Sequence, residues 1–350
     1  MSSVLHRPSE AGRFRRACRQ VQKAFRHGQV RFLRKARSRG LATAAFFDVW
    51  GRGMDCMGKR RLDFVIPPEY NGRKVVHFLR GPAQCSYTLV RSLKTLEDGI
   101  LLNGAHIRTI DRLHTGDRLS ITICDAPQVF EPCETPVEIL YEDSDVIVYN
   151  KPAAMACHPV RGLRQGTLAN VFARDCAARG ENCACRLVGR LDCDTSGAVV
   201  IAKNAHAAAV LTGHIEKQYI ALVTGAPNPI CGVIDAPIGQ PDRMNPRRTV
   251  TADGKPAVTE YETQIRCGEY SVVRCVLRTG RTHQIRVHMS SIGCPLLGDA
   301  LYGGETERIE RQALHCMQAS FIHPVDKRLC IVRAPIPKDM QKLMPRNQQT

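Results

Sequence analysis

The stretch GRLDCDTSGAVVIAKN, residues 189–204, decides how this chain is interpreted, because it places two carboxylates directly before an apolar strand. Asp192 and Asp194 are two residues apart, so on an extended chain their side chains lie on the same face. Asp194 begins an Asp-Thr-Ser-Gly turn, in which Asp commonly accepts hydrogen bonds from backbone N–H groups. This context predicts a structural role for Asp194. No such local role accounts for Asp192, which is therefore the candidate reactive carboxylate.

A group of basic residues near the end of the chain is the second feature of the candidate site. Its members are Arg278, Arg281, His283, Arg286 and His288. A carboxylate has a reference pKa of about 3.9, and full burial would raise it by about 3–5 units and leave the group protonated. A neighbouring Arg lowers the pKa by about 1–3 units and offers a bidentate partner. A buried catalytic Asp192 therefore needs an Arg.

Residues 137–337 resemble the RluA-like RNA pseudouridine synthases through a series of ordered motifs. The matching segments are NKPAAMACHP (150–159), GRLDCDTSGAVVIAKN (189–204), EKQYIALVTG (216–225), LRTGRTHQIRVHMSSIGCPLLGDALYGG (277–304) and LHCMQASFIHP (314–324). That family isomerises uridine in RNA by breaking the N1–C1′ bond, rotating the base and rejoining it through C5, without cofactor or metal. The resemblance implies the same reaction here, on structured ribosomal or transfer RNA.

The resemblance also implies roles for three catalytic residues. Asp192 would be the nucleophile or base, and Arg286 would be its salt-bridge partner. Tyr219 would stack on the uracil and is a candidate for moving a proton. From the residues alone, Tyr219 fits equally well as a core tyrosine of the strand KQYIALV. Arg281 would lie near a substrate phosphate or near the same Asp192.

Five residues are expected to contact the RNA around the reacting base, namely Arg190, Arg281, His283, Lys151 and His158. Extracting a base from its stack costs a few kcal/mol, and the planar guanidinium of Arg190 would fill the gap by stacking. Lys151 and His158 would shape the RNA groove, although His158 fits a structural role as well. Gly189 stands where the family usually has His, so altered substrate handling is expected.

Two other functions fit parts of the sequence. A non-catalytic RNA-binding or ribosome-assembly factor could keep the fold, but it would not need Asp192, Tyr219 and Arg286 together. A glycosidase would require both Asp192 and Asp194 as a carboxylate pair. It would explain neither the N-terminal part of the chain nor the segment 277–304.

The 350 residues suffice for roughly two domains. The sequence predicts a basic extension over 1–56, a module over 57–126, a linker over 127–136 and a catalytic domain over 137–340. The whole chain is expected to be α+β, with one large mixed or antiparallel sheet following the small α+β module. In the module, the helix–helix–strand pattern, LLNG and a later Gly-Asp resemble the S-four-like RNA-binding domain. A purely structural α+β cap is the alternative.

The charge is concentrated at the N-terminus. Of a net charge of +17, residues 1–61 carry +13, from 16 Lys and Arg against three acids, and the other 289 residues carry +4. RNA is the natural partner of such a protein, and the body must bind it through a local patch. Residues 1–56 fit an organellar transit peptide, an RNA-binding arm or an extension upstream of a start at Met57, and the last of these is favoured slightly.

Sixteen cysteines and no signal peptide indicate a reducing compartment. The cytoplasm is expected, or a mitochondrion if residues 1–56 are a transit peptide. Cys176, Cys183, Cys185 and Cys193 come nearest to a metal pattern, but their CAC core lacks the gap of two residues that zinc sites use. These cysteines are therefore expected to be small buried hydrophobic side chains, and no metal is expected. No apolar run approaches the roughly 20 residues of a bilayer span. A monomer is assumed.

Overall fold

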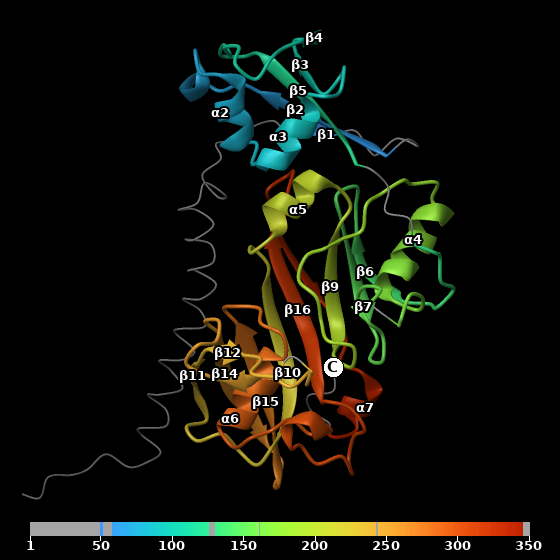
Figure 1. Ribbon diagram of the computed structural model, residues 1–350, viewed down its shortest axis with the longest axis vertical. Helices are drawn as coiled ribbons and strands as arrows, with labels where there is room; N and C mark the ends of the chain where they lie inside the picture. Colours follow the sequence, from blue (N-terminus) through green and yellow to red (C-terminus); the bar gives the residue numbers. More distant parts are fainter. Residues whose placement is uncertain (1–49, 52–57, 126–129, 161, 243, 346–350) are drawn as a thin grey trace, which may run out of the picture.

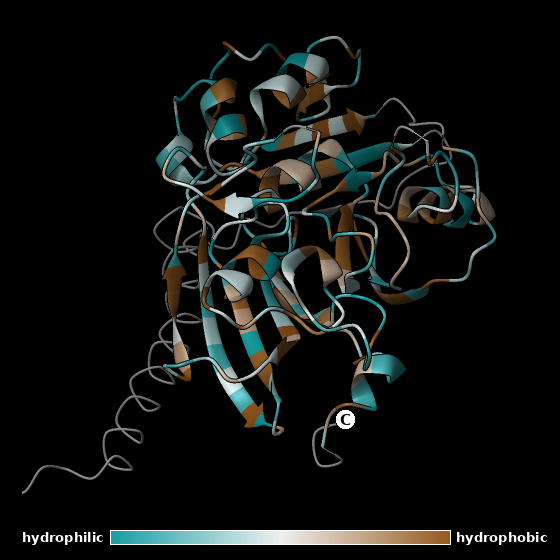
Figure 2. Cartoon of the chain, turned by 60° about the horizontal axis from the view of Figure 1, so that its bottom comes forward, coloured by the Kyte–Doolittle hydropathy of each residue, from teal (hydrophilic) through white to brown (hydrophobic). Residues whose placement is uncertain are grey.

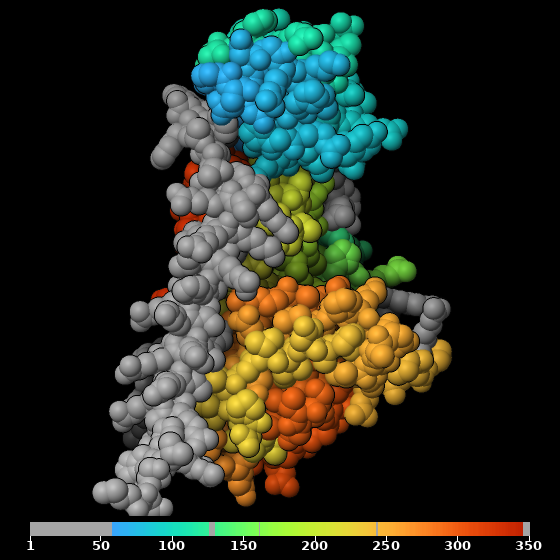
Figure 3. Space-filling model, turned by 90° about the vertical axis from the view of Figure 1, so that its left-hand side faces the viewer, coloured from blue at the N-terminus to red at the C-terminus, as the bar shows by residue number. Residues whose placement is uncertain are grey.

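The computed structural model describes residues 50–51, 58–125, 130–160, 162–242 and 244–345. A small module and a larger β-rich body lie one above the other in Figure 1, and Figure 3 shows the same order from the side. Within the described ranges, no helix combines the length and the apolar character needed to cross a bilayer. Most of the basic extension over 1–56, and Met57, lie outside the described residues.

The small module is a five-stranded sheet packed against two short helices, with the strand order β1-β2-β5-β3-β4. Its elements are β1 (Trp50–Gly51), β2 (Lys59–Val65), η1 (Pro68–Tyr70), α2 (Val75–Arg80), α3 (Tyr87–Leu93), β3 (Ile100–Leu102), β4 (Ala105–His106) and β5 (Arg118–Cys124). Leu62, Phe78 and Leu93 belong to its core and are almost completely buried. The side chain of Ser86 caps α3 by accepting a hydrogen bond from the backbone of Leu89.

The two helices and the strands of the module follow one another in the order that the sequence predicts. The run ILLNGAHI forms two strands, β3 and β4. Asn103 and Gly104 have φ values of 53° and 87°, the positive values that a tight hairpin turn requires, so β3 folds back on β4. Trp50 and Gly51 pair with β2, so the sheet includes part of the segment 1–56. The resemblance to an S-four-like domain stays a prediction.

The body contains a ten-stranded sheet with the order β11-β14-β15-β10-β16-β9-β7-β6, in which β17 pairs with β16 and β8 pairs with β9. These strands are β6 (Glu138–Glu142), β7 (Val146–Lys151), β8 (Arg186–Leu187), β9 (Ser196–Ala202), β10 (Glu216–Thr224), β11 (Cys231–Asp235), β14 (Val258–Arg266), β15 (Tyr270–Leu277), β16 (Leu314–Ile322) and β17 (Leu329–Arg333). The pairing of β9 with β16 is parallel, and the other pairs of adjacent strands in this sheet are antiparallel. The expected large mixed sheet is confirmed.

Short helices and one small ribbon complete the body. They are α4 (Leu168–Ala178), α5 (Ala205–Leu211), α6 (Gln284–Ser291), η2 (Ala300–Tyr302), α7 (Lys338–Gln341) and the ribbon of β12 (Ile238–Gly239) with β13 (Thr249–Val250). Asn204 caps α5 by accepting from the backbone of Ala207. Figure 2 shows hydrophobic and hydrophilic residues alternating along strands of the sheet, the period-2 pattern of a strand with two different faces. Residues 130–136, part of the expected linker, have no regular structure.

A buried ion pair docks the module on the body. The guanidinium of Arg60 on β2 donates to both carboxylate oxygens of Asp145, before β7, at 3.0 and 2.7 Å. Both side chains are about 95% buried or more. Val325 of the body belongs to the module core, and His206 on α5 donates to the carbonyl of Ala83 at 2.8 Å. Removing one partner of a buried ion pair is strongly destabilising, so the two units hold each other in place.

Acid is expected to weaken this junction through His206. Burial, and next to it the cation of Lys327, lowers the pKa of His206 from 6.5 to about 4. The unfolded chain binds a proton that the folded chain does not, so stability present above pH 6.5 is lost as the pH falls toward 4. The loss is about 3 kcal/mol at about 1.4 kcal/mol per pKa unit. Urea midpoints at pH 7 and pH 5 test this.

The matched variant for that measurement is His206→Gln, whose amide can still donate to Ala83. The difference between the two pH values is expected to shrink in this variant. It should not vanish, because burial also lowers the pKa of His315 to about 4. An equal difference in wild type and variant would contradict the role of His206.

Candidate active site

A cavity of about 520 Å³ opens on the body beside the loop that precedes β9. Its wall is formed by residues 187–192, the end of α5, β10 and the segment 277–286. The volume lies in the range of small-molecule sites. Asp192, Tyr219 and Arg286, which the sequence predicts to be catalytic, all line this cavity. Arg190, Arg281 and His283 line it too.

The loop that carries Asp192 is fixed from beneath by Lys151. The ammonium group of Lys151 donates to the carbonyls of Pro152, Met155 and Cys193, each at 2.7 Å. Burial lowers the pKa of Lys151 to about 8, and its side chain has no exposed surface. The expected contact of Lys151 with RNA is therefore wrong. The ammonium group instead binds three backbone carbonyls. A buried charge without such hydrogen-bond partners would be strongly unfavourable.

A close contact between strands fixes the far end of the same loop. Gly197, the second residue of β9, has a φ of 111°, and a Cβ there would lie 2.3 Å from the carbonyl oxygen of Cys316 on β16. Only glycine allows this approach, which brings β9 and β16 together at their parallel pairing. The loop of Asp192 thus starts and ends on rigid structure.

Asp192 faces the cavity with two cationic or protonatable neighbours. Its Oδ2 lies 3.6 Å from Nη1 of Arg286 and 3.9 Å from Nε2 of His283. The Asp192 side chain is 23% exposed, whereas that of Arg286 is 8% exposed. The carboxylate is therefore accessible from the cavity while its cation is held in the wall.

Asp299 holds Arg286 in place, and the sequence reasoning missed it. Its carboxylate accepts two hydrogen bonds from Arg286, at 2.6 and 2.8 Å, and its side chain is 1% exposed. The guanidinium also lies 4.9 Å from the ring centre of Tyr302, a distance suited to a cation–π contact. The available signal was an isolated acid in the apolar run CPLLGDALY, because a buried charge needs a partner.

His283 sits in the left-handed region at the start of α6, with φ 59° and ψ 19°. Its Nδ1 is 2.9 Å from the hydroxyl of Tyr302. Burial lowers the pKa of His283, while the neighbouring charge of Asp192 acts in the opposite direction. A non-glycine residue in this conformation is uncommon and is often found at functional sites. The structure thus puts His283 beside the carboxylate of Asp192.

Tyr219 lies on β10 and is 4% exposed. Burial, with the charges of Cys316 and Asp192 as smaller causes, raises its pKa well above the ordinary value. The residue therefore belongs to the core and to the cavity wall at the same time. This burial fits the interpretation as a core tyrosine, and stacking on the uracil stays a prediction.

Three exposed arginines line the cavity, namely Arg190, Arg278 and Arg281, and Arg278 is paired with Glu260. Arg190 donates to the hydroxyl of Thr282 at 3.0 Å, and Arg281 donates to the carbonyl of Pro256 at 2.9 Å. Both bonds use only part of a guanidinium that has five donors. His158 is exposed on the loop after β7, where its ring meets Phe130 edge-on. It does not line the cavity, and its contact with RNA stays a prediction.

Asp194 and Gly189, on either side of Asp192 in the sequence, have surroundings that the sequence did not predict. Asp194 does not line the cavity, and its backbone carbonyl accepts from Arg311 at 3.1 Å. Within the described residues its carboxylate accepts no hydrogen bond, so the expected bonds from the N–H groups of the turn are not formed. Gly189 has a φ of 80°, and a Cβ there would lie 3.3 Å from Nζ of Lys217. A His at this position would be strained and would crowd that lysine, which donates to the carbonyl of Gly189 at 2.9 Å.

Replacing Lys151 by Met is expected to destabilise the protein and lower its turnover together. The variant leaves the carbonyls of Pro152, Met155 and Cys193 without this donor, and the buried carbonyl of Met155 alone costs about 1–3 kcal/mol. The salt dependence of RNA affinity should stay unchanged, because the ammonium group does not reach the surface. Urea unfolding and RNA titrations at several salt concentrations test this. A reduced salt slope with intact stability would instead restore the expected RNA contact.

Comparison with known proteins identifies the family of this chain. A family model described as RNA pseudouridylate synthase matches residues 145–291. The chain is 37% identical over 294 residues to an RNA pseudouridine synthase of Bacillus subtilis, YhcT, covering 81% of this chain and 96% of the relative. It is 37% identical over 268 residues to ribosomal large subunit pseudouridine synthase D of Xanthomonas campestris, covering 70% and 80%. Human RNA Pseudouridylate Synthase Domain Containing 4 has a TM-score of 0.48 and 26% identity, covering 58% of this chain and 89% of the human one.

The extent of these matches defines the class first. The chain has a mixed sheet that carries the ordered motifs, and it matches its relatives over most of their length. These two findings define an RNA-modifying isomerase. The chain belongs to the RluA-like family of RNA pseudouridine synthases. It is an enzyme that isomerises uridine to pseudouridine in RNA, as the motifs implied.

Proposed function

We propose that Asp192 is the catalytic carboxylate and that it acts on a uridine flipped into the 520 Å³ cavity. The observation that carries this proposal is the placement of Asp192 on the cavity wall, 3.6 Å from the buried Arg286. A guanidinium fixed by Asp299 stabilises a neighbouring carboxylate as the anion. The anion is the form required of a nucleophile or a base.

The chemistry needs no external reagent. The N1–C1′ bond breaks, the uracil turns, and C5 bonds to C1′; C5 loses one proton and N1 gains one, so atoms and charge balance. Asp192 serves as the nucleophile or base, and Arg286 fixes its position. The raised pKa of Tyr219 keeps it a neutral phenol, which suits stacking on the uracil and donating a hydrogen bond. It suits removal of the C5 proton less well.

A second hollow next to the cavity gives the RNA strand a path. This groove of about 760 Å³ shares Gly280, Arg281 and Thr282 with the cavity and continues to Arg248 and Lys255. Phosphates bind Arg and Lys through charge-assisted hydrogen bonds. We infer that the strand leaves the flipped nucleotide along this groove. The small module, if it is S-four-like, adds RNA affinity at the other end of the molecule.

Arg190→Ala is expected to lower turnover on a uridine within a stem more than on a uridine in a loop. The guanidinium would fill the gap left by the flipped base, and unstacking costs a few kcal/mol, least for an unpaired base. The ratio of the two rates should therefore change by about tenfold or more, since 1.4 kcal/mol is a factor of ten. Arg91→Ala, on α3 of the module, is the charge-matched control. Equal losses on both substrates would contradict the wedge role.

The relatives support a ribosomal target. The Xanthomonas protein is named for the large ribosomal subunit, and proteins with this name from other bacteria match as well. We propose large-subunit ribosomal RNA as the substrate, with transfer RNA as the second candidate, and the cytoplasm as the location. Pseudouridine mapping with and without the gene tests this, followed by reaction of purified enzyme with the mapped RNA. If the purified protein forms no pseudouridine in ribosomal or transfer RNA, the binding-factor interpretation replaces this one.

A further inference from the structure

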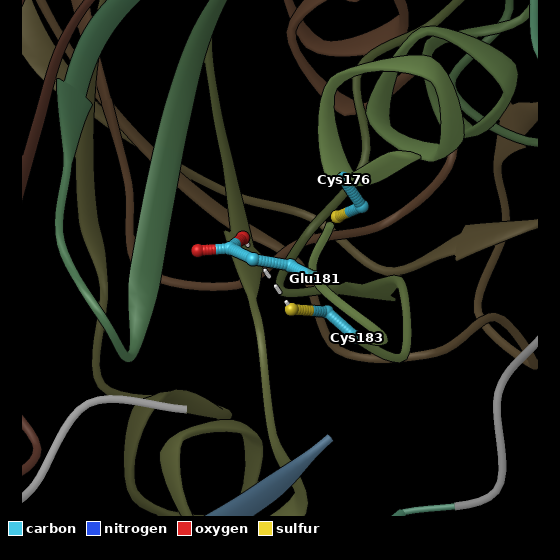
Figure 4. Close-up of side chains that lie close together, drawn as sticks. All are labelled: Cys176, Glu181 and Cys183. Atoms are coloured by element: carbon cyan, nitrogen blue, oxygen red, sulfur yellow. Dashed lines mark hydrogen bonds between the residues drawn. The ribbon is translucent and has the colours of Figure 1, made fainter. Parts of the chain in front are cut away.

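Cys176, Glu181 and Cys183 form a compact group (Figure 4). Cys176 is near the C-terminus of α4, and the other two follow on the segment that leads to β8. The two sulfur atoms and one carboxylate oxygen all lie within 4.8 Å of one another. Both cysteines are more than 90% buried. Figure 4 shows the Cys183 thiol directed at the Glu181 carboxylate, to which it donates at 3.7 Å.

The separations suit a tetrahedral metal ion. A Zn–S bond of about 2.3 Å and tetrahedral angles put two sulfur ligands about 3.8 Å apart, and a carboxylate oxygen slightly closer. The observed upper limit of 4.8 Å means that closure requires a shift of about one ångström or less. Glu181 is 25% exposed, so the group has an entry path from solvent, as a metal site requires.

The surrounding charges permit two thiolates and a divalent cation. Lys203 and Arg179 pair with Glu142 and Glu181, at distances between 2.7 and 3.5 Å. This set of two cations and two anions is neutral. A divalent ion that replaces two thiol protons leaves the buried charge unchanged, so no uncompensated charge is created.

We propose that Cys176, Cys183 and Glu181 bind one zinc ion, with water as the fourth ligand. Binding exchanges two thiol protons for Zn²⁺, forms two Zn–S bonds and one Zn–O bond, and involves no oxidation. Lys203 then acts as an outer partner of the ligating carboxylate.

The expected consequence is a brace for the active-site loop. The ion would join the end of α4 to the segment 181–185, which continues through β8 to Gly189 and Asp192. The sequence argued against a metal because the CAC core of Cys183 and Cys185 lacks the gap of two residues that zinc sites use. Cys193 is exposed, and Glu181 is the third member of the group instead. This inference does not depend on the proposed catalytic roles.

Titration of the purified, reduced full-length protein with Co²⁺ and Zn²⁺ tests the site. The expected result is one Co²⁺ per chain with thiolate-to-cobalt absorption, displaced by one equivalent of Zn²⁺, and a higher thermal midpoint with Zn²⁺. Cys176→Ser and Cys183→Ser should lose this signal, and Glu181→Gln should weaken it. Cys185→Ala is the matched control, because Cys185 is buried in the same segment but lies outside the group, and it should bind normally.

Three outcomes would overturn the proposal. The first is no saturable Co²⁺ absorption in the folded wild type. The second is equal loss in Cys185→Ala, which would place the metal elsewhere. The third is a disulfide between Cys176 and Cys183 in reduced preparations, found by peptide mass analysis. Pseudouridine formation is measured separately, so failure here leaves the proposed function untouched.

Discussion

Asp192→Asn is expected to abolish pseudouridine formation while RNA binding survives. Asparagine keeps the size and the hydrogen-bonding capacity of the side chain but lacks the negative charge that a nucleophile or base needs. A loss of about 10⁴-fold corresponds to the upper range for a general base. Folding should be unaffected, because the Asp192 side chain is 23% exposed and Arg286 keeps its two bonds to Asp299. Initial rates of pseudouridine formation and RNA titrations measure the two effects.

Asp194→Asn is the matched control for this experiment. It makes the same chemical change two residues away, outside the cavity, so turnover should be nearly unchanged. If both variants lost activity equally, the two carboxylates would act as a pair, and the single-carboxylate mechanism would fail. If Asp192→Asn stayed active, Asp192 would be no more than a structural residue of the loop.

Much of the fold could be predicted because local patterns carry it. The apolar run after Asp194 forms β9, and the run KQYIALV forms most of β10, as expected. The association of Asp192 with Arg286, 94 positions along the chain, was also expected, from the motifs and from the need of a buried carboxylate for a cation. A pattern of this kind depends only on which residue types meet.

What could not be predicted depends on how distant backbone segments meet. The buried position of Lys151 is one such feature. No local pattern shows that three carbonyls converge on its ammonium group. The pair of Arg60 with Asp145 could not be predicted for the same reason, since it joins the module to the body. Asp299 lies inside the motif at 277–304, but a position within a motif does not show that a carboxylate is buried and therefore needs a cation.

Replacing Asp299 by Leu is expected to be the most destabilising single change at the site. It leaves the guanidinium of Arg286, which is 8% exposed, without its bidentate partner, and breaking a buried pair costs about 3–5 kcal/mol. Turnover should fall with it, because Arg286 would no longer be held beside Asp192. Urea unfolding gives the stability, and rates at temperatures well below the unfolding transition give the activity.

The double variant Arg286→Met, Asp299→Leu separates the two consequences. Apolar side chains of similar volume in place of a buried ion pair are often neutral or stabilising, so most of the lost stability should return. Activity should not return, because Asp192 would face the cavity without its cation. A stable double variant with near-normal turnover would show that Arg286 serves folding alone. A stable but inactive one would establish that the buried pair exists to position a charge at Asp192, at a cost in stability that an apolar pair would not carry.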